Sequence, residues 1–392
     1  MERERVSMSA PDITEEDVRA VAEVVRSGRL ALGPKTEEFE HLMAEYVGVK
    51  HAVAVSSGTT ALHLIVKALG IGPGNEVLVP SFTFVSSVNV ILYEGAIPVF
   101  VDIEPDTYNL DPEDLERKVT PRTKAIMAVD VFGHPAEWDA ILDIAKRHGL
   151  RVIDDSCEAL GAEYSSPESK VQSPKSEKQE NPARGAWKKV GRFGDAAAFA
   201  FYPNKQMTTG EGGIIVTSNE NIARLARSMR NQGRGEMGEW LEHERLGYNY
   251  RMTEMSAALG VSQLRRLEAL LAKRERVARM YTERLAGLPW VRPPAVRPHV
   301  RMSWFVYVVT LAEGLHRDPV MKAMAKEGIP TRGYFSPVHL QSYIQSLLGT
   351  RGGMLPFTES VAKRTIALPF HGNMTEGQVE TVVGVLKRAC VP

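Results

Sequence analysis

The chain has 392 residues, of which 43% are hydrophobic, enough for a large globular domain with a smaller one beside it. Its 48 Lys and Arg residues balance its 48 Asp and Glu residues, so no overall charge favours nucleic acid or an anionic membrane surface. Its two cysteines, Cys157 and Cys390, are too few for a disulfide framework. The start MERERVSMSA lacks the apolar stretch of a signal peptide, and no apolar run approaches the ~20 residues of a membrane span. We therefore expect a cytoplasmic protein without a membrane segment.

Short apolar runs rich in β-branched residues recur along the first two thirds of the chain. Between several of them lie amphipathic stretches typical of helices, at residues 60–69 and 137–148. This alternation predicts a largely parallel α/β sheet, in which ligands gather at the carboxyl ends of the strands. The seven candidate strands cover residues 52–55, 76–79, 97–103, 125–131, 151–153, 196–201 and 213–217.

The last third of the chain has a different pattern. A long helical stretch covers residues 253–285 and is followed by the proline-rich segment PWVRPPAVRP. A strand-like run at 305–311, a helical pattern at 319–327 and a last helix at 376–388, capped by Thr375, complete the chain.

We predict two domains from these patterns. A large domain covers residues 1–265, and a small C-terminal α/β domain covers residues 266–392. Residues 165–189 are rich in Ser, Pro, Lys and Glu and nearly empty of large apolar side chains, which predicts a mobile insertion.

The segment VSSGTTALHL places small polar residues between a strand and a helix. Gly58 lets the backbone turn tightly, and the free N–H groups at the positive end of the helix dipole face whatever lies at the turn. Gly58, Thr59 and Thr60 are therefore candidates for binding a phosphate group. The same residues are typical of an ordinary capped helix start, and the segment alone does not decide between the two.

The segment RVIDDSCEALGA has two acidic residues directly after an apolar strand. If the strand continues through them, Asp154 and Asp155 point to opposite faces of the sheet. One carboxylate can then project into a site, while the other meets solvent or a neighbouring helix. The alternative is an acidic helix start, where aspartate is common.

The segment AAAFAFYPNKQMTTGEGG has one lysine, Lys205, between a very apolar strand and a glycine-rich turn. An amine near apolar walls retains a neutral fraction that can attack a carbonyl and form a Schiff base. The alternative is a lysine whose methylene groups cover the end of a strand.

The three segments together match the needs of pyridoxal 5'-phosphate. This cofactor requires an anion cradle, a carboxylate that keeps its ring nitrogen protonated, and a lysine amine for its aldehyde. All three candidates occur in chain order, each at the end of a predicted strand. The sequence therefore predicts a pyridoxal phosphate site, and it predicts no metal site.

Ordered motifs along nearly the whole chain resemble those of the DegT/DnrJ/StrS family of sugar aminotransferases. These motifs include SGRLALGPKTEEFE, VLVPSFTFVSS, PVFVDIEPDTYNLDP, LGYNYRMTEMSAALG and ALPFHGNMT, besides the three segments above. The resemblance implies the fold type I architecture of pyridoxal-phosphate-dependent transferases, with active sites shared across a homodimer. It also implies that glutamate gives its amino group to a nucleotide-linked keto-sugar.

The resemblance assigns roles residue by residue. Lys205 matches the lysine that forms the Schiff base, and Asp155 matches the acid that pairs with the ring nitrogen. Phe84 matches an aromatic ring that stacks on the cofactor, although an isolated Phe in an apolar run is more often a core residue. Asn249 matches an asparagine that reaches the phosphate from the neighbouring subunit; without the resemblance it is a turn residue. The turn at 58–60 matches the phosphate-binding turn.

The chain departs from the family pattern at two positions. Ala200 stands where many relatives have a serine that binds phosphate, so one hydrogen bond is missing or replaced. Glu158 stands where a glutamine commonly meets the phenolic oxygen of the cofactor. An ionised carboxylate there would repel a phenolate, so Glu158 either holds a proton or points elsewhere.

Two more residues, His339 and His371, match family positions near the substrate. Arg332, in TRGYF, is a candidate for meeting a substrate phosphate or carboxylate. A lone histidine is more often a structural residue, and an arginine on a surface is more often part of a salt bridge.

Other functions stay open within and beyond this family. Related dehydratases carry a histidine in place of the Schiff-base lysine, so Lys205 favours transamination. A cyclitol ketone is an alternative acceptor, and a regulatory protein that keeps the fold without chemistry is a further alternative.

Overall fold

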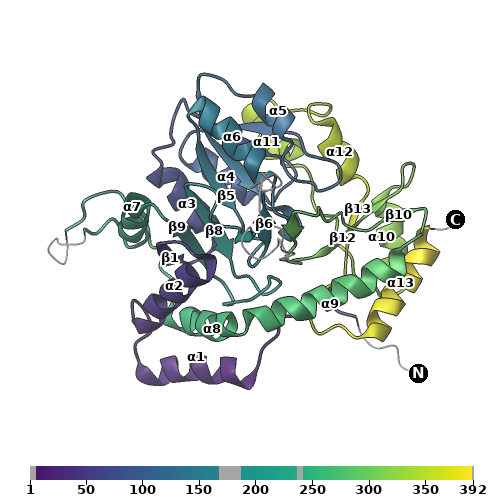
Figure 1. Cartoon of the computed structure of the whole chain (residues 1–392), viewed down its shortest axis with the longest axis horizontal. Coiled ribbons are helices and arrows are strands. Elements are labelled where there is room, and N and C mark those ends of the chain that lie inside the picture. Colours follow the sequence, from purple (N-terminus) through teal and green to yellow (C-terminus); the bar gives the residue numbers. More distant parts are fainter. Residues whose placement is uncertain (1–5, 167–186, 236–241, 391–392) are drawn as a thin grey trace, which may run out of the picture.

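A seven-stranded sheet forms the centre of the computed structural model, which describes residues 6–166, 187–235 and 242–390 (Figure 1). The strand order is β1-β9-β8-β5-β4-β2-β3. β9 is antiparallel to both of its neighbours, and the other pairings are parallel. All seven predicted strands are confirmed, with ends shifted by at most a few residues. The strands are β1 (His51–Val55), β2 (Glu76–Pro80), β3 (Ile97–Val101), β4 (Thr123–Val129), β5 (Arg151–Asp155), β8 (Ala196–Ala200) and β9 (Gly213–Thr217).

Helices cover both faces of this sheet because successive strand residues point to opposite sides. In β1, Val53 and Val55 pack under α3, α4 and α7, while Ala52 and Ala54 pack under α2 and α8. Trp138 of α6 packs against β2, β4 and β5, on the face of the sheet that also carries Ala52 and Ala54. These helices are α2 (Pro34–Val47), α3 (Gly58–Ala68), α4 (Ser86–Tyr93), α6 (Trp138–His148), α7 (Glu220–Arg230) and α8 (Glu254–Arg265).

The helix predicted over residues 253–285 is two helices, α8 and α9 (Leu267–Leu285). Arg266 interrupts them with a backbone at φ −114° and ψ 14°. Its guanidinium donates to the carboxylates of Asp12 and Asp17, at 2.7 and 2.8 Å. These bonds hold the break against the N-terminal segment, a contact that helical periodicity does not reveal.

A second sheet lies at the far end of α9 (Figure 1). Its order is β10-β12-β13, and it shares a hydrophobic core with α9, α10 and α13. Thr375 caps α13 as predicted, since its hydroxyl accepts the N–H of Gln378 at 3.2 Å. The elements are β10 (Val291–Arg292), β12 (Tyr307–Leu311), β13 (Thr365–Leu368), α10 (Arg317–Lys326) and α13 (Glu376–Cys390).

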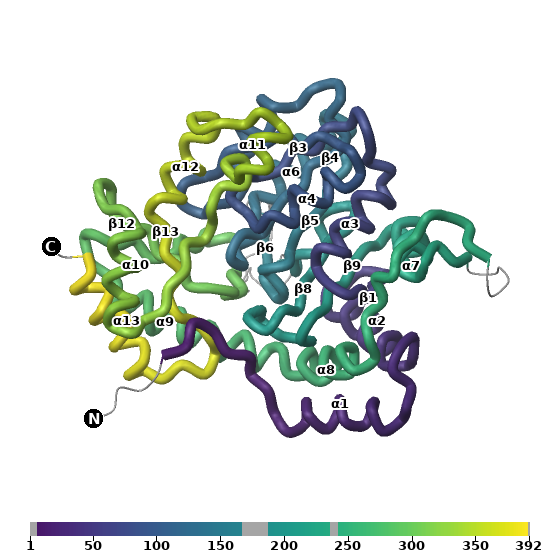
Figure 2. The backbone as a smooth tube through the Cα atoms, turned by 180° about the vertical axis from the view of Figure 1, so that it is seen from behind, coloured from purple at the N-terminus to yellow at the C-terminus, as the bar shows by residue number. Residues whose placement is uncertain are grey.

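Segments from both ends of the chain connect the two sheets. Ile344 of α11 and Leu355, before α12, join the core of the large sheet. The backbone N–H of Phe370 donates to the carbonyl of Met8 at 3.0 Å. From there the chain runs to α1, which packs on α8 (Figure 2).

The domain boundary at residue 265 stays a prediction. The helices are α1 (Glu15–Ser27), α5 (Pro112–Arg117), α11 (Ser342–Leu348) and α12 (Pro356–Ala362).

A third, small sheet corrects the bounds of the predicted insertion at 165–189. Ser165 ends β6 (Glu163–Ser165) and pairs with Trp187, the first residue of β7 (Trp187–Lys189). β11 (Val300–Arg301) pairs with the other edge of β6. Both ends of the predicted insertion are therefore strands, and residues 167–186 lie outside the described residues. Within the described ranges, every helix is too short or too polar to cross a membrane.

Candidate active site

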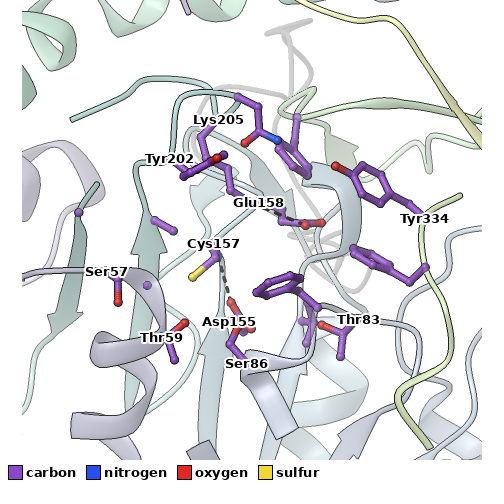
Figure 3. Close-up of a pocket in the computed structure, with 18 of the residues that line it drawn as sticks. Ser57, Thr59, Thr83, Ser86, Asp155, Cys157, Glu158, Tyr202, Lys205 and Tyr334 are labelled. Atoms are coloured by element: carbon purple, nitrogen blue, oxygen red, sulfur yellow. Dashed lines mark hydrogen bonds and ion pairs between the residues drawn. The ribbon is translucent and has the colours of Figure 1, made fainter. Parts of the chain in front are cut away.

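The carboxyl ends of β1, β2, β5 and β8 meet at one cavity of about 430 Å³ (Figure 3). This volume falls within the roughly 300–1,000 Å³ of small-molecule sites. Its position agrees with the expectation that ligands gather at the carboxyl edge of a parallel sheet. Among the described residues, no group of three or more His, Cys, Asp or Glu side chains is arranged to hold a metal ion.

The turn between β1 and α3 lines one side of the cavity. Ser57 caps α3: its hydroxyl accepts the N–H of Thr60 at 3.2 Å, and the Thr60 hydroxyl accepts the N–H of Ser57 at 3.0 Å. Ser57, Gly58 and Thr59 line the cavity. The Thr60 side chain serves the cap and does not line it. The segment is both a capped helix start and part of the cavity wall.

Gly58 packs closely against the neighbouring strand. A Cβ at this position would lie 2.7 Å from the Cβ of Ala200 and 2.8 Å from the Sγ of Cys157. These contacts are too short for real carbon atoms, so the turn requires glycine here. The alanine at 200, where relatives often have serine, lies directly against this turn.

Asp155 ends β5 and lines the cavity with 4% of its surface exposed. Its carboxylate accepts the hydroxyl of Ser87 at 2.6 Å and the backbone N–H of Cys157 at 3.2 Å. Asp154 points to the other face, where its carboxyl accepts the N–H of Gly191 at 2.8 Å. The predicted alternation along the strand is confirmed, and the alternative of an acidic helix start is wrong.

Lys205 lies in the loop after β8 and points into the cavity (Figure 3). Its Nζ lies 3.8 Å from the centre of the Phe305 ring and 3.8 Å from the Oε1 of Glu158. Only 13% of the lysine side chain is exposed. The amine is thus held between an aromatic wall and a carboxyl group, and is not a solvated surface charge.

Glu158 points into the cavity, so the alternative in which its side chain points elsewhere is excluded. Its Oε2 accepts the N–H of Phe132 at 2.9 Å. Burial raises the pKa of the Glu158 carboxyl, although Lys205 and the Phe132 N–H oppose this shift. Burial thus favours the protonated form over the ionised form that would repel a phenolate.

Aromatic rings form the rest of the wall. Phe84 is 59% exposed at the cavity, so the alternative of a core residue is wrong for it. Tyr202, Phe305 and Tyr334 also line the cavity, and the sequence analysis did not identify them. Tyr202 could have been found from its place three residues before Lys205. Phe305 and Tyr334 come from distant segments and carry no local signal.

The three residues predicted near the substrate do not line the cavity. His339 is fully buried, with its ring nitrogens 2.7 Å from the Ser81 hydroxyl and 3.2 Å from a Glu359 carboxylate oxygen. Because both nitrogens are engaged, His339 has no free group for a substrate, and its structural interpretation holds. His371 is buried elsewhere, and Arg332 is exposed and donates to a neighbouring backbone carbonyl.

Asn249 is exposed and does not line the cavity of its own chain. The rings beside it are anchored: Tyr248 and Tyr250 stack with centres 4.7 Å apart, and the Tyr250 hydroxyl lies 3.1 Å from the Nδ1 of His63 in α3. The loop is therefore fixed to the large sheet's helices while the Asn249 side chain stays available to another molecule.

Comparison with known proteins places this geometry in a family. The model of the DegT/DnrJ/EryC1/StrS aminotransferase family matches residues 11–387. The GDP-perosamine synthase of Caulobacter vibrioides is 40% identical over 395 residues, which cover 99% of each chain.

Solved structures agree with this match. The S. venezuelae protein DesV, in complex with a ketimine intermediate, has a TM-score of 0.85 at 35% identity, over 96% of this chain and 95% of that one. The pyridoxal phosphate form of the sugar aminotransferase Spr1654 from Streptococcus pneumoniae, whose assignment is itself provisional, has a TM-score of 0.89 at 28% identity, over 99% of both chains. The resemblance and the fold class predicted from the sequence are thereby confirmed. A dehydratase or a non-catalytic protein finds no support in these matches. The chain belongs to the DegT/DnrJ/EryC1/StrS aminotransferase family and is a pyridoxal-phosphate-dependent sugar aminotransferase.

Proposed function

We propose that the protein transfers the amino group of glutamate to the ketone of a nucleotide-linked sugar, and that Lys205 carries the cofactor. The observation that carries this proposal is the meeting of Lys205, Asp155 and a capped helix N-terminus at one cavity. The name of the GDP-perosamine synthase describes a nucleotide-linked amino sugar as that relative's product, which supports the same class of acceptor here.

The residues at the cavity fit pyridoxal phosphate. The turn at Ser57, Gly58 and Thr59 offers N–H groups and hydroxyls to a phosphate at the positive end of α3. The Asp155 carboxylate, held by Ser87, is the partner for the ring nitrogen, and the exposed Phe84 ring offers a stacking surface.

The bound cofactor supplies an aldehyde that takes up the amino group and a ring that accepts electrons. Lys205 would hold the cofactor through its Nζ and, as a free amine, would move the proton at the reacting carbon. The Phe305 ring lies against that amine, and only 13% of the lysine side chain is exposed.

We propose that Glu158 acts in its neutral form, as a hydrogen-bond donor to the phenolic oxygen of the cofactor. A carboxyl with a raised pKa keeps its proton to higher pH, and kcat should fall as the pH rises through that pKa. Glu158→Gln keeps a neutral donor, so we expect kcat within about threefold of the wild type and no such fall. The pH profile of kcat, followed upward from the ordinary titration range of a carboxyl, measures this, and a profile that Glu158→Gln leaves unchanged contradicts the role.

We also propose a homodimer in which Asn249 reaches the phosphate site of the second subunit, because this exposed side chain sits on an anchored loop outside its own cavity. Lys205→Ala and Asn249→Ala should each lower activity. In mixed dimers one site then carries both changes and the other carries neither. Random mixing of equal amounts should restore about a quarter of the wild-type activity.

The control for the mixing experiment is a mixture of Lys205→Ala with Asp155→Asn. Both residues line the cavity of their own chain, so each site of a mixed dimer carries one damaging change and no activity should return. Size-exclusion chromatography with light scattering checks the dimer. If mixed dimers gain no activity over the separate variants, Asn249 does not serve the partner subunit's site.

The direct test of the proposed reaction is incubation of the loaded enzyme with glutamate and a panel of nucleotide-linked keto-sugars, with a cyclitol ketone included. Mass spectrometry and NMR should find one nucleotide-linked amino sugar and an equal amount of 2-oxoglutarate. Amination of the cyclitol alone would replace the proposed acceptor, and turnover without 2-oxoglutarate would replace the proposed donor.

A further inference from the structure

Arg274 of α9 is a buried cation whose hydrogen bonds to described residues all go to backbone carbonyls. Its residue surface is 5% exposed, and burial lowers the pKa of its guanidinium to about 10. Among the residues that the structure describes, no carboxylate forms an ion pair with it. Asp12, whose charge raises the pKa of Arg274 against the effect of burial, bonds instead to Arg266 and Lys273. Burying an unpaired charge is costly, so its four carbonyl bonds must offset a large desolvation penalty.

These carbonyls belong to two segments that are far apart in the sequence. One nitrogen, Nη2, donates to the carbonyls of Asn204 at 3.2 Å and Lys205 at 2.5 Å. The other, Nη1, donates to the carbonyls of Trp304 at 3.3 Å and Phe305 at 3.1 Å. The planar guanidinium therefore joins the loop after β8 to the segment before β12.

The two joined segments carry the amine and the ring that meet in the cavity. The Lys205 Nζ lies 3.8 Å from the centre of the Phe305 ring. A second bridge runs beside the first, since the Gln206 amide donates to the carbonyls of Glu158 at 2.6 Å and Ser303 at 3.1 Å. The backbones that carry the amine and the ring are thus held together by the side chains of Arg274 and Gln206.

We propose that Arg274 is a positioning residue that sets Lys205 against Phe305 and thereby makes the amine reactive toward the cofactor's aldehyde. The inference rests on the proposed attachment at Lys205, in which the lysine nitrogen replaces the aldehyde oxygen and that oxygen leaves as one water. Arg274 touches neither the cofactor site nor the substrate, since it does not line the cavity.

Lysine cannot replace arginine in this role. A guanidinium presents its N–H groups in a rigid plane and reaches both segments at once, whereas an ammonium is a single nitrogen on a flexible stem. Arg274→Lys keeps the charge but loses one of the two links. The loop with Lys205 should then shift relative to the Phe305 ring, and a displacement of about 1 Å at a reacting group can cost up to about 10²-fold in rate.

The experiment separates attachment from binding. Apo protein is mixed with pyridoxal phosphate, and covalent attachment is followed by stopped-flow absorbance and by borohydride reduction with mass analysis of the Lys205 peptide. Binding of 4-deoxypyridoxine phosphate, which lacks the aldehyde, reports whether the cavity is intact. For Arg274→Lys we expect attachment slowed about 10-fold or more, with affinity for the analogue within about twofold of wild type.

Arg276→Lys is the matched control. Arg276 lies on the same helix and also donates to carbonyls, those of Gly372 at 3.1 Å and Met374 at 3.0 Å, but these are outside the cavity. The Arg276→Lys variant should attach the cofactor at the wild-type rate.

Phe305→Leu provides an independent test, since it removes the ring but keeps the carbonyl that Arg274 binds. It should show the same slow attachment with unchanged binding of the analogue.

The outcomes are distinct. An attachment rate equal to that of the wild type in Arg274→Lys overturns the proposal. An equal loss of analogue binding and of attachment also overturns it, because Arg274 would then have a general structural role. Should Arg274→Lys fail to fold, a wild-type attachment rate in Phe305→Leu overturns it. Absence of any adduct at Lys205 in the wild type refutes the proposed function instead, whatever the variants do.

Discussion

Lys205→Ala should lower kcat by about 10³-fold or more, since the variant loses both the amine that holds the cofactor and the base that moves the proton. The side chain reaches into the cavity and is 13% exposed, so alanine removes a group from the site without opening the core. Steady-state rates with glutamate and the keto-sugar found in the panel measure the loss. Borohydride reduction should label the Lys205 peptide in the wild type and leave the variant unlabelled.

Lys205→Arg is the matched control for charge and size. A guanidinium keeps the positive charge beside Glu158 and Phe305 but is a poor nucleophile at neutral pH, so this variant should be as inactive as the alanine variant. Activity above about a tenth of wild type in either variant would show that another group holds the cofactor.

Asp155→Asn should lower kcat by about 10²-fold to 10³-fold. The amide keeps the size of the side chain and can still accept the Ser87 hydroxyl, which lies 2.6 Å from the carboxylate. It cannot keep the cofactor's ring nitrogen protonated, so the ring accepts electrons poorly. Rates and the absorbance spectrum of the loaded variant measure the effect, and retained cofactor binding separates it from a loss of the site.

Asp154→Asn is a control one residue away on the other face of β5. Burial, together with the neighbouring Asp130, raises the pKa of the Asp154 carboxyl well above its usual range. Asparagine therefore mimics the neutral form that burial favours. We expect kcat within about threefold of wild type for this variant. An equal loss in Asp154→Asn and Asp155→Asn would mean that both act through the stability of the strand.

The core of the large sheet was predictable because local patterns are strong there. Each of the seven strands is a short apolar run, and buried strands need such residues wherever they lie in a sheet. The alternation of Asp154 and Asp155 also follows from a strand's period of two, so their opposite directions could be deduced before any contact was known. The break at Arg266 was missed, because it depends on carboxylates at Asp12 and Asp17 that lie far away in the chain.

By itself the sequence determined the elements, the order of the motifs and the three candidate groups at strand ends, because each depends on neighbours within a few residues. Only the tertiary structure decided which side chains share the cavity. It excluded His339, whose ring nitrogens are engaged by Ser81 and Glu359, and it brought Phe305 to Lys205 through the carbonyl bonds of Arg274. Contacts between distant segments arise from packing and from the need to satisfy buried polar groups, and a local pattern encodes neither.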